Sequence, residues 1–364
     1  MTFTPGLELS RSFYQDAVRP VLDSLFPGLP HAAGLIDSGS EVLGFDDPMS
    51  TDHHWGPRVM LFLREEDQER YADTLQEALR NRLPNTFAGY PTNFSDPDPT
   101  DHGTQLLTSV ESGPVNHRVT VQTIRLFFQG HLGFDPDGPL EPADWLTFSE
   151  QRLRTVADGG VFHDTIGPEE MRRRLAYYPD EVWLYLLASG WARIGQEEHL
   201  MGRAGLVGDE IGSAVIGARL VRDSMRLCFL MKRVYAPYPK WFGTAFQQLP
   251  IATQMSPSLQ GALRAATWQE REAQLVATYE LLAMQHNRLG LTEPLPERVT
   301  PFFGRPFRVM AIQGFSDALL RKITDPTVQR IAQRPPIGGI DQFSDSTDLL
   351  SNPEWREKLK KLYG

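Results

Sequence analysis

The chain has 364 residues and a formal net charge of −10, and 41% of its residues are hydrophobic and 23% are charged. This length and composition are typical of a globular protein with room for two domains, each with its own core. The negative charge disfavours broad, non-specific nucleic-acid binding, although a local basic pocket is compatible with it. The single cysteine, Cys228, excludes an intramolecular disulfide and a cysteine-based zinc site.

Neither the hydropathy nor the N-terminus of the sequence indicates a membrane protein. The chain has no run of about 18 apolar residues, the length of a membrane-spanning helix. Its first residues lack the charged, apolar and small-residue order of a signal peptide. We therefore expect a cytoplasmic protein with no membrane partner.

The N-terminal part of the chain alternates between helix and strand patterns. Residues 8–26 carry apolar side chains at helical spacing and end at Pro27-Gly28, a common helix stop. Two short apolar runs, 32–36 and 58–63, predict strands. A tight turn at Gly39-Ser40, a short amphipathic segment and a polar loop connect the two strands.

Further elements follow up to a turn-rich segment. Residues 65–83 are polar with one apolar face, which is the pattern of a surface helix packed on a sheet. Alternating polar and apolar residues predict strands at 105–110 and 117–124, and residues 125–132 are predicted to form a helix. The string GFDPDGPLEPA, residues 133–143, is rich in turn formers, and we place the domain boundary there.

After this boundary the apolar spacing changes and helical patterns dominate. Apolar residues recur three and four apart in five segments: 149–156, 168–176, 180–194, 211–234 and 258–289. The change predicts an α/β (α+β) head with a mixed sheet in residues 1–140, followed by a mainly helical domain in residues 141–364.

Most of the reactive side chains of the N-terminal half lie between the first two predicted strands. They are carboxylates, hydroxyls and imidazoles: Asp37, Ser38, Ser40, Glu41, Asp46, Asp47, Ser50, Asp52, His53 and His54. A Gly-Ser pair in a turn after a strand presents backbone N–H groups to an anion. A carboxylate that leads into the next strand is well placed to hold a divalent cation beside that anion.

This arrangement resembles the nucleotidyltransferase superfamily of the DNA polymerase β type. The signature of that superfamily is Gly-Ser, a spacer, and Asp-x-Asp at the start of a strand, and Gly39-Ser40 is followed by Asp52 at a compatible spacing. The strings GSEVLGFDDPMSTDHHWGP and YAPYPKWFG resemble a bacterial branch of unknown function in the superfamily, related to the kanamycin-type nucleotidyltransferases. The resemblance implies a nucleotidyltransferase head and a helical second domain.

The resemblance also implies a nucleoside triphosphate such as ATP as substrate and a divalent metal, Mg²⁺ or Mn²⁺, as cofactor. Gly39 would let the backbone approach the phosphates and Ser40 would donate its hydroxyl. Asp52 would be the principal metal ligand and a catalytic residue.

The sequence departs from the signature at two positions. The second carboxylate would fall at residue 54, which is His54, and Thr120 stands on a later predicted strand where a third carboxylate is expected. On a strand, His54 would share a face with Asp52, so we assign both as metal ligands. Imidazole suits Mn²⁺ or Zn²⁺ better than Mg²⁺. Alternatively, Asp46 and Asp47 complete the site or form an ordinary turn before Pro48, or the protein is a degenerate binder.

The helical half offers a candidate general base and a candidate phosphate-binding arginine. Glu197 or Glu198 could face a cleft and activate an acceptor hydroxyl, or both could lie on a solvated helix end; we assign Glu198. Arg226 recurs on one helix face with Arg219 and Arg222. This face either contacts phosphate, with Arg226 as the assigned residue, or forms an ion network.

Two further positions of the helical half are candidates. Lys240 follows two prolines and would begin a helix, where it could contact triphosphate as a point charge. The neighbouring aromatic residues would stack on a base or belong to the core. His163 follows a Gly-Gly turn and is either a metal ligand or a hydrogen-bonded structural histidine.

Two functions are compatible with these residues. The first is an enzyme that transfers a nucleoside monophosphate from the triphosphate to an unidentified hydroxyl acceptor, either a small molecule or a macromolecule, with metal and amides stabilising the developing charge. The second is a nucleotide-binding or regulatory protein that retains the fold without turnover. We take the enzyme as the principal interpretation and the binder as the alternative, which the departures at His54 and Thr120 support.

Overall fold

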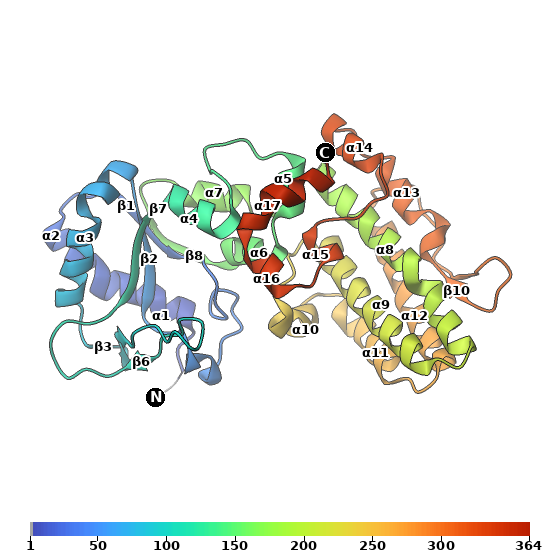
Figure 1. Cartoon of the computed structure of the whole chain (residues 1–364), viewed down its shortest axis with the longest axis horizontal. Coiled ribbons are helices and arrows are strands. Elements are labelled where there is room, and N and C mark those ends of the chain that lie inside the picture. Colours follow the sequence, from blue (N-terminus) through green and yellow to red (C-terminus); the bar gives the residue numbers. More distant parts are fainter. Residues whose placement is uncertain (1–2) are drawn as a thin grey trace. The chain divides into compact units, whose positions relative to one another are not determined.

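The computed structural model describes residues 3–364 and divides into two compact units (Figure 1). The first unit consists of the chain up to Pro139 together with Arg152–Ala176, and the second consists of Leu140–Gln151 and Tyr177–Gly364. The segment Arg152–Ala176 therefore belongs to the first unit, although it follows the boundary placed in the turn-rich stretch. Its strand explains why, because this strand pairs with the sheet of the first unit.

The first unit is built on a mixed four-stranded sheet in the order β7-β2-β1-β8. Its strands are β1 (His31–Leu35), β2 (Arg58–Leu63), β7 (Arg118–Thr123) and β8 (Gly160–Asp164). β1 runs antiparallel to both β2 and β8, whereas β2 runs parallel to β7. The mixed sheet is confirmed, but β8 was not predicted, since its GVFHD sequence has no clear alternation between polar and apolar residues.

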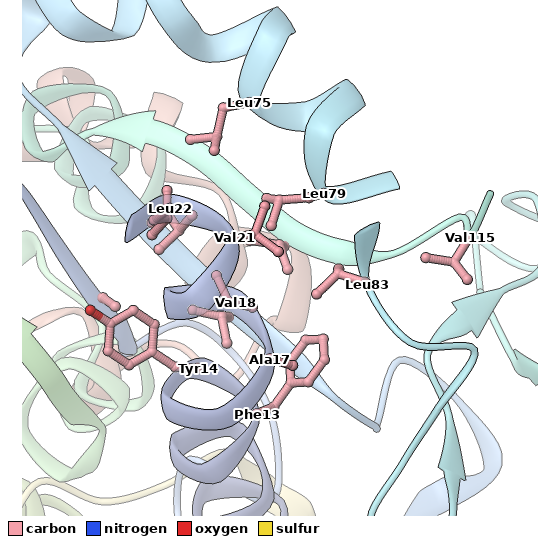
Figure 2. Packing of buried hydrophobic residues seen from close by; sticks show 14 of the residues in the cluster. Phe13, Tyr14, Ala17, Val18, Val21, Leu22, Leu75, Leu79, Leu83 and Val115 are labelled. Carbon is pink, nitrogen blue, oxygen red and sulfur yellow. The ribbon is translucent and has the colours of Figure 1, made fainter. Parts of the chain in front are cut away.

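Helices cover both faces of β2, which explains its uninterrupted apolar sequence. On one face, α1 (Gly6–Phe13), a π-helical segment (Tyr14–Val18), α2 (Arg19–Leu25) and α3 (Glu65–Arg82) contribute a buried apolar cluster (Figure 2). Val59, Leu61 and Leu63 of β2 point into this cluster. On the opposite face, Phe62 contacts Phe127 of α4 (Ile124–Leu132), with 5.7 Å between ring centroids.

Charged residues, a threonine cap and a terminal glycine mark the ends of helices α3 and α4 in the first unit. α3 has three acidic residues in its first turn and two arginines in its last, which complements the helix dipole. Thr123 caps α4 by accepting a hydrogen bond from the Leu126 amide, and Gly133 ends it in the left-handed conformation. The remaining elements are α6 (Glu150–Asp158), whose first two residues are assigned to the second unit, α7 (Pro168–Arg174), and the short strands β3 (Thr86–Phe87), β4 (Tyr90–Pro91), β5 (Asn93–Phe94) and β6 (Leu107–Thr108).

The second unit is largely helical, as predicted. Its longer helices are α8 (Asp180–Leu206), α9 (Glu210–Met231), α10 (Pro239–Gln247), α11 (Ala252–Arg264) and α12 (Trp268–Arg288). Shorter helices are α5 (Pro142–Thr147), α13 (Phe315–Leu320), α14 (Pro326–Ala332), α15 (Ile340–Phe343), α16 (Thr347–Ser351) and α17 (Arg356–Leu359). Two-residue strands β9 (Thr300–Pro301) and β10 (Arg308–Val309) pair with each other.

One helix expected from the sequence is two helices in the structure. The pattern over 258–289 is interrupted after Arg264, and Thr267 begins α12 through a capping box with Glu270. The cap thus starts a new helix at Trp268, although the helical spacing of apolar residues continues across the break between α11 and α12. Within the described part of the chain, no helix combines the length and apolarity that a membrane crossing needs.

We predict that Leu79→Ala destabilises the first unit by about 2–5 kcal/mol, because Leu79 of α3 is completely buried and the substitution leaves a cavity. Leu126→Ala is the matched control, since Leu126 is 49% exposed on α4. Urea denaturation combined with hydrogen exchange of the α3 and β2 amides would measure both variants. Equal stability losses in the two variants would contradict the packing described.

Candidate functional site

The Gly39-Ser40 turn lies at one end of the four-stranded sheet, beside two arginines. β1 ends at Leu35, and its antiparallel register with β2 brings the following residues to the start of β2. Arg58 begins β2 and pairs in register with Arg118, which begins β7. We use the name arginine edge for the Gly39-Ser40 turn together with Arg58 and Arg118.

Arg58 holds the turn through a buried ion pair. Its Nε donates to Oε1 of Glu41 at 2.8 Å, and its Nη2 donates to the Ser38 carbonyl at 2.7 Å. Both charged side chains are nearly excluded from solvent. Gly39 makes the pair possible, because a Cβ atom there would lie 2.4 Å from Oε2 of Glu41 and 2.5 Å from Nη2 of Arg58. The positive φ of Gly39, +156°, also favours glycine.

Asp37 lies in the same turn and is held by a histidine. Its Oδ1 is 3.3 Å from Nδ1 of His131 on α4. Burial alone would raise the pKa of Asp37, but the hydrogen bond and charge of His131, together with Arg58, lower it well below its ordinary value. Arg152 donates in turn to the His131 carbonyl at 2.6 Å. The Asp37 carboxylate is therefore ionised, and its negative charge is stabilised by His131 and Arg58.

Arg118 is the guanidinium of the edge that lacks a carboxylate partner. Among residues 3–364, no carboxylate oxygen lies within 4.0 Å of a guanidinium nitrogen of Arg118. Instead, Nη1 of Arg118 contacts Nδ1 of His54 at 2.5 Å. It also lies over the ring of Phe94, 5.6 Å from the centroid. Burial, and then the charge of Arg58, lower the pKa of Arg118 to about 10, so the group is charged at neutral pH. The edge thus carries a half-buried cation that can receive an anion.

Asp52 and His54 do not occupy a strand, which corrects the argument that placed them on one face. Asp52 ends a 3-10 helix (Pro48–Asp52), and β2 begins only at Arg58. His54 has a positive φ of +54°, so side-chain alternation does not apply. Pro57, which cannot donate to a strand ladder, directly precedes the strand, which begins at Arg58 as the apolar run 58–63 predicts. The start of β2 therefore carries an arginine where the resemblance implies carboxylates.

The residues around Asp52 do not fit a shared metal ion. Oδ1 of Asp52 lies 2.7 Å from Nδ1 of the neighbouring His53, and the side chain is 59% exposed. It lines a hollow of about 780 Å³ with Asp96, Asp98 and Asp101, whereas Nδ1 of His54 faces Arg118. Nowhere in residues 3–364 do three or more His, Cys, Asp or Glu side chains converge as metal ligands. The metal role of Asp52 and His54 stays a prediction that this geometry does not support.

The alternative carboxylates serve the local structure. Asp46 accepts hydrogen bonds from the Gly6 amide at 2.7 Å and from Nε1 of Trp55 at 2.9 Å. Asp47 caps the 3-10 helix by accepting from the amides of Met49 and Ser50. Thr120 lies on β7 with its side chain exposed. These positions therefore do not complete a metal site.

The proposed base, Glu198, is buried in the second unit. Its two carboxylate oxygens accept from the amides of Met310 at 2.7 Å and Ala311 at 3.1 Å, at the start of a 3-10 helix (Ala311–Gln313). Burial raises the pKa of Glu198 to about 7, against the lowering effect of these amides. The neighbouring Glu197 forms an ion pair with Arg219 of α9 at 2.7 Å. Both carboxylates thus anchor structure within the unit.

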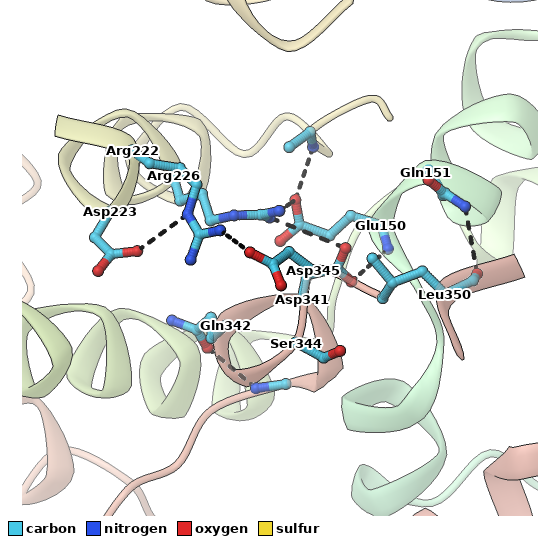
Figure 3. A network of polar contacts seen from close by, with 12 residues as sticks. Glu150, Gln151, Arg222, Asp223, Arg226, Asp341, Gln342, Ser344, Asp345 and Leu350 are labelled. Carbon is cyan, nitrogen blue, oxygen red and sulfur yellow. Dashed lines mark hydrogen bonds and ion pairs between the residues drawn. The ribbon is translucent and has the colours of Figure 1, made fainter. Parts of the chain in front are cut away.

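Arg226 lies in a buried polar network of the second unit (Figure 3). Its Nη1 is 3.9 Å from a carboxylate oxygen of Glu150 and 3.9 Å from one of Asp341. Its Nε and Nη1 have no hydrogen-bond partner among the described residues. Arg226 lines a small cavity with Gly190 of α8, and Glu198 is eight residues further along that helix. At 1.5 Å per residue the two positions are about 12 Å apart along α8, so they do not form one site.

The other arginine of the predicted stripe and Lys240 are also accounted for within the second unit. Arg222 forms an ion pair with Asp345 at 2.6 Å. Lys240 lies in the first turn of α10, as expected, with its Nζ 4.9 Å from the centroid of the Trp241 ring. The side chain of Lys240 is exposed. The nucleotide-binding roles of Arg226 and Lys240 stay predictions.

The arginine edge was missed from the sequence, although a signal for it exists. Arg58 and Arg118 each precede an apolar strand pattern, but the parallel register that brings them together cannot be read from one sequence. Asp37 was noted only as one of many polar residues. Its partner, His131, lies on a helix that follows the third strand of the sheet.

Comparison with known proteins gives a family match over part of the chain and a distant similarity to a solved structure. A family described as a domain of unknown function (DUF4037) matches residues 145–242, a segment that includes Glu198, Arg226 and Lys240. No curated protein matches the chain. Among solved structures, the chain is similar to a nucleotidyltransferase-like protein from Exiguobacterium sibiricum 255-15, at 10% sequence identity and a TM-score of 0.34, with 86% of this chain and 91% of that chain covered. The chain therefore shows a distant structural similarity to a nucleotidyltransferase-like protein.

We predict that Gly39→Ala lowers the stability of the first unit by about 1–3 kcal/mol, because the added methyl group would overlap the Arg58–Glu41 ion pair. Gly130→Ala is the matched control, since a Cβ atom there meets nothing within 4 Å and alanine favours helix α4. Thermal denaturation, with hydrogen exchange of residues 37–45, would compare them. A Gly39→Ala variant as stable as the wild type would show that the turn tolerates a side chain.

A second prediction concerns pH and Glu198. Because its pKa is raised on folding, the folded state binds this proton more tightly than the unfolded state, and the stability it contributes is present below about pH 4.5 and lost as pH rises through about 7. Relative to Glu198→Gln, the wild type should therefore lose about 3 kcal/mol over this interval. Urea denaturation at pH 5 and pH 8 measures the difference.

The control for this experiment is Glu293→Gln, because Glu293 lies on the surface of the same unit. That variant should follow the wild-type pH profile. A constant difference between wild type and Glu198→Gln at both pH values would contradict the raised pKa of Glu198.

Proposed function

We propose that the chain is a nucleotidyltransferase-like protein that binds the phosphate groups of a nucleoside triphosphate at the arginine edge, without a resident divalent metal. The observation that carries the proposal is the position of Arg118. It is a half-buried cation without a carboxylate partner among the described residues, beside the Gly-Ser turn. A phosphate oxygen is the kind of group that a guanidinium binds with paired hydrogen bonds.

The charge balance of the edge supports this assignment. Arg58 is neutralised by Glu41, and Asp37 is compensated by His131 and by the positive charge of Arg58. Arg118 is therefore the cation of the edge that has no direct ion-pair partner among the described residues, although Glu41 and Asp37 attract it from a longer distance. The amide of Gly39 has no hydrogen-bond partner among residues 3–364, so it is available to donate to the same anion.

A second candidate is the metal-dependent transfer of a nucleoside monophosphate from the triphosphate to a hydroxyl acceptor. One observation favours it: the Asp52 carboxylate is exposed and accessible to an ion that arrives with the nucleotide. Mg²⁺ is commonly held by one or two carboxylates together with substrate phosphates rather than by a complete protein cage. The Asp52 and His54 geometry described above does not support a preformed site, so we rank this candidate second.

Isothermal titration with ATP separates the two candidates. In the presence of EDTA, the wild type should bind ATP, and Arg118→Ala should raise the Kd about 10-fold to 100-fold, since a hydrogen bond to a charged group contributes about 1.5–3 kcal/mol. Asp52→Asn should bind like the wild type. Arg82→Ala is the control, because Arg82 is exposed at the end of α3 and forms no ion pair with a described residue.

Two results would overturn the proposal. Binding that requires Mg²⁺ or Mn²⁺ and is lost in Asp52→Asn would favour the metal-dependent enzyme. In that case, release of pyrophosphate from labelled triphosphate in the presence of an extract of candidate acceptors would identify the reaction. Unchanged affinity of Arg118→Ala in EDTA would remove the arginine edge from consideration.

A further inference from the structure

A second cavity of the first unit lies at the opposite end of the sheet from the arginine edge. It has a volume of about 430 Å³, which is in the range of small-molecule sites. Its wall contains His31 at the start of β1, Arg64 just after β2 and His163 near the end of β8. Strand register places these three residues at one end, since His31 pairs with Leu63 and His163 pairs with Ala33. The length of a six-residue strand separates the two ends by about 17–20 Å.

Two arginines from separate elements line this cavity. Arg64 is exposed and has no carboxylate partner within 4.0 Å among the described residues. Arg19 of α2 forms an ion pair with Asp23 at 3.5 Å, but both side chains are at least half exposed, so this pair contributes little and can rearrange. Arg19, Arg64 and Asp23, the charged side chains of the wall, together carry one net positive charge.

The two histidines differ in what they can offer a ligand. Nδ1 of His31 lies 2.9 Å from the Leu29 carbonyl and therefore carries the proton, so Nε2 accepts from the Tyr14 hydroxyl at 2.9 Å. Burial lowers the pKa of His31, in agreement with a neutral, fully bonded ring. His163 stacks on it with 4.6 Å between centroids, and its ring nitrogens have no hydrogen-bond partner among residues 3–364. His163 is thus the imidazole available to a ligand.

Apolar groups complete the wall. Leu22 and Phe26, from α2 and the residue that follows it, line the cavity together with Leu29 and Pro30. The hydroxyl of Thr165 also lies in the wall, but it already accepts from the amide of His31 and donates to its carbonyl. The cavity therefore combines an apolar side with a cationic rim and offers few other polar groups.

From this arrangement we propose that the cavity binds a small organic carboxylate. The carboxylate group lies between the guanidinium groups of Arg19 and Arg64, with the His163 ring as a further donor, and the apolar part of the ligand contacts Leu22 and Phe26. A single net positive charge matches a monoanion better than the dianion of a phosphate monoester. Arginine forks fit carboxylates in a paired geometry. This site is separate from the proposed nucleotide site.

Isothermal titration with phenylacetate and hexanoate tests the proposal, with benzyl alcohol as the neutral probe and phenyl phosphate as the dianionic probe. The wild type should bind at least one carboxylate and should bind benzyl alcohol more weakly. Arg64→Ala should weaken carboxylate binding about 5-fold to 10-fold, and Arg64→Lys should recover part of the loss. Arg82→Ala, at an exposed position outside the cavity wall, should bind like the wild type.

A crossed comparison separates this site from the arginine edge. Arg64→Ala should bind ATP like the wild type, and Arg118→Ala should bind the carboxylate like the wild type. Thermal denaturation should show both variants folded, since Arg64 is exposed and Arg118 is half-buried. Absence of binding by both carboxylates, equal binding of benzyl alcohol, preference for phenyl phosphate, or an unchanged affinity in Arg64→Ala would each overturn the proposal.

Discussion

The buried Arg58–Glu41 ion pair determines the geometry of the sheet end that we assign to phosphate. A buried pair loses hydration on both partners, so it is retained only where the geometry satisfies both ions. Here Arg58 also donates to the Ser38 carbonyl, and the pair therefore fixes the backbone on either side of Gly39. A side chain at Gly39 would occupy the space of both charged groups. Glycine is thus required at position 39 for a structural reason, whether or not the turn also contacts a ligand.

The same constraint explains why the sequence predicted the sheet better than the site. Apolar spacing identifies β1, β2 and α3 because burial of one or both faces dictates it. β8 was missed because five residues with mixed polarity give no periodicity. The break between α11 and α12 depends on one capping threonine, which a continuous apolar pattern conceals. Local chemistry of this kind is present in the sequence but is weaker than the hydrophobic signal.

Asp52 shows a different limit of sequence reasoning. A motif gives spacing along the chain, whereas ligand geometry requires directions in space. The residues between Asp52 and Arg58 form bends rather than a strand, and His54 has a positive φ with its side chain in contact with Arg118. Likewise, the pairing of Arg58 with Arg118 depends on a parallel register between strands far apart in the chain. No single-sequence pattern contains that register, so the arginine edge became visible only in the structure.

The arginines of the two units differ in whether they face carboxylates, and this difference determines where an anion is expected to bind. In the second unit, Arg226 faces Glu150 and Asp341, and burial raises the pKa of Asp341 even though Arg226 opposes the rise. Such a guanidinium can bind phosphate only if it exchanges these carboxylates for another anion. At the sheet of the first unit, both faces of β2 are covered, so polar groups from its neighbours gather at the strand ends. Among the described residues, Arg118 has no carboxylate within ion-pair distance there, although Glu41 and Asp37 act on it from further away. An incoming anion then gains the attraction of the cation without first breaking an ion pair, which favours the strand ends of the first unit over the arginines of α9.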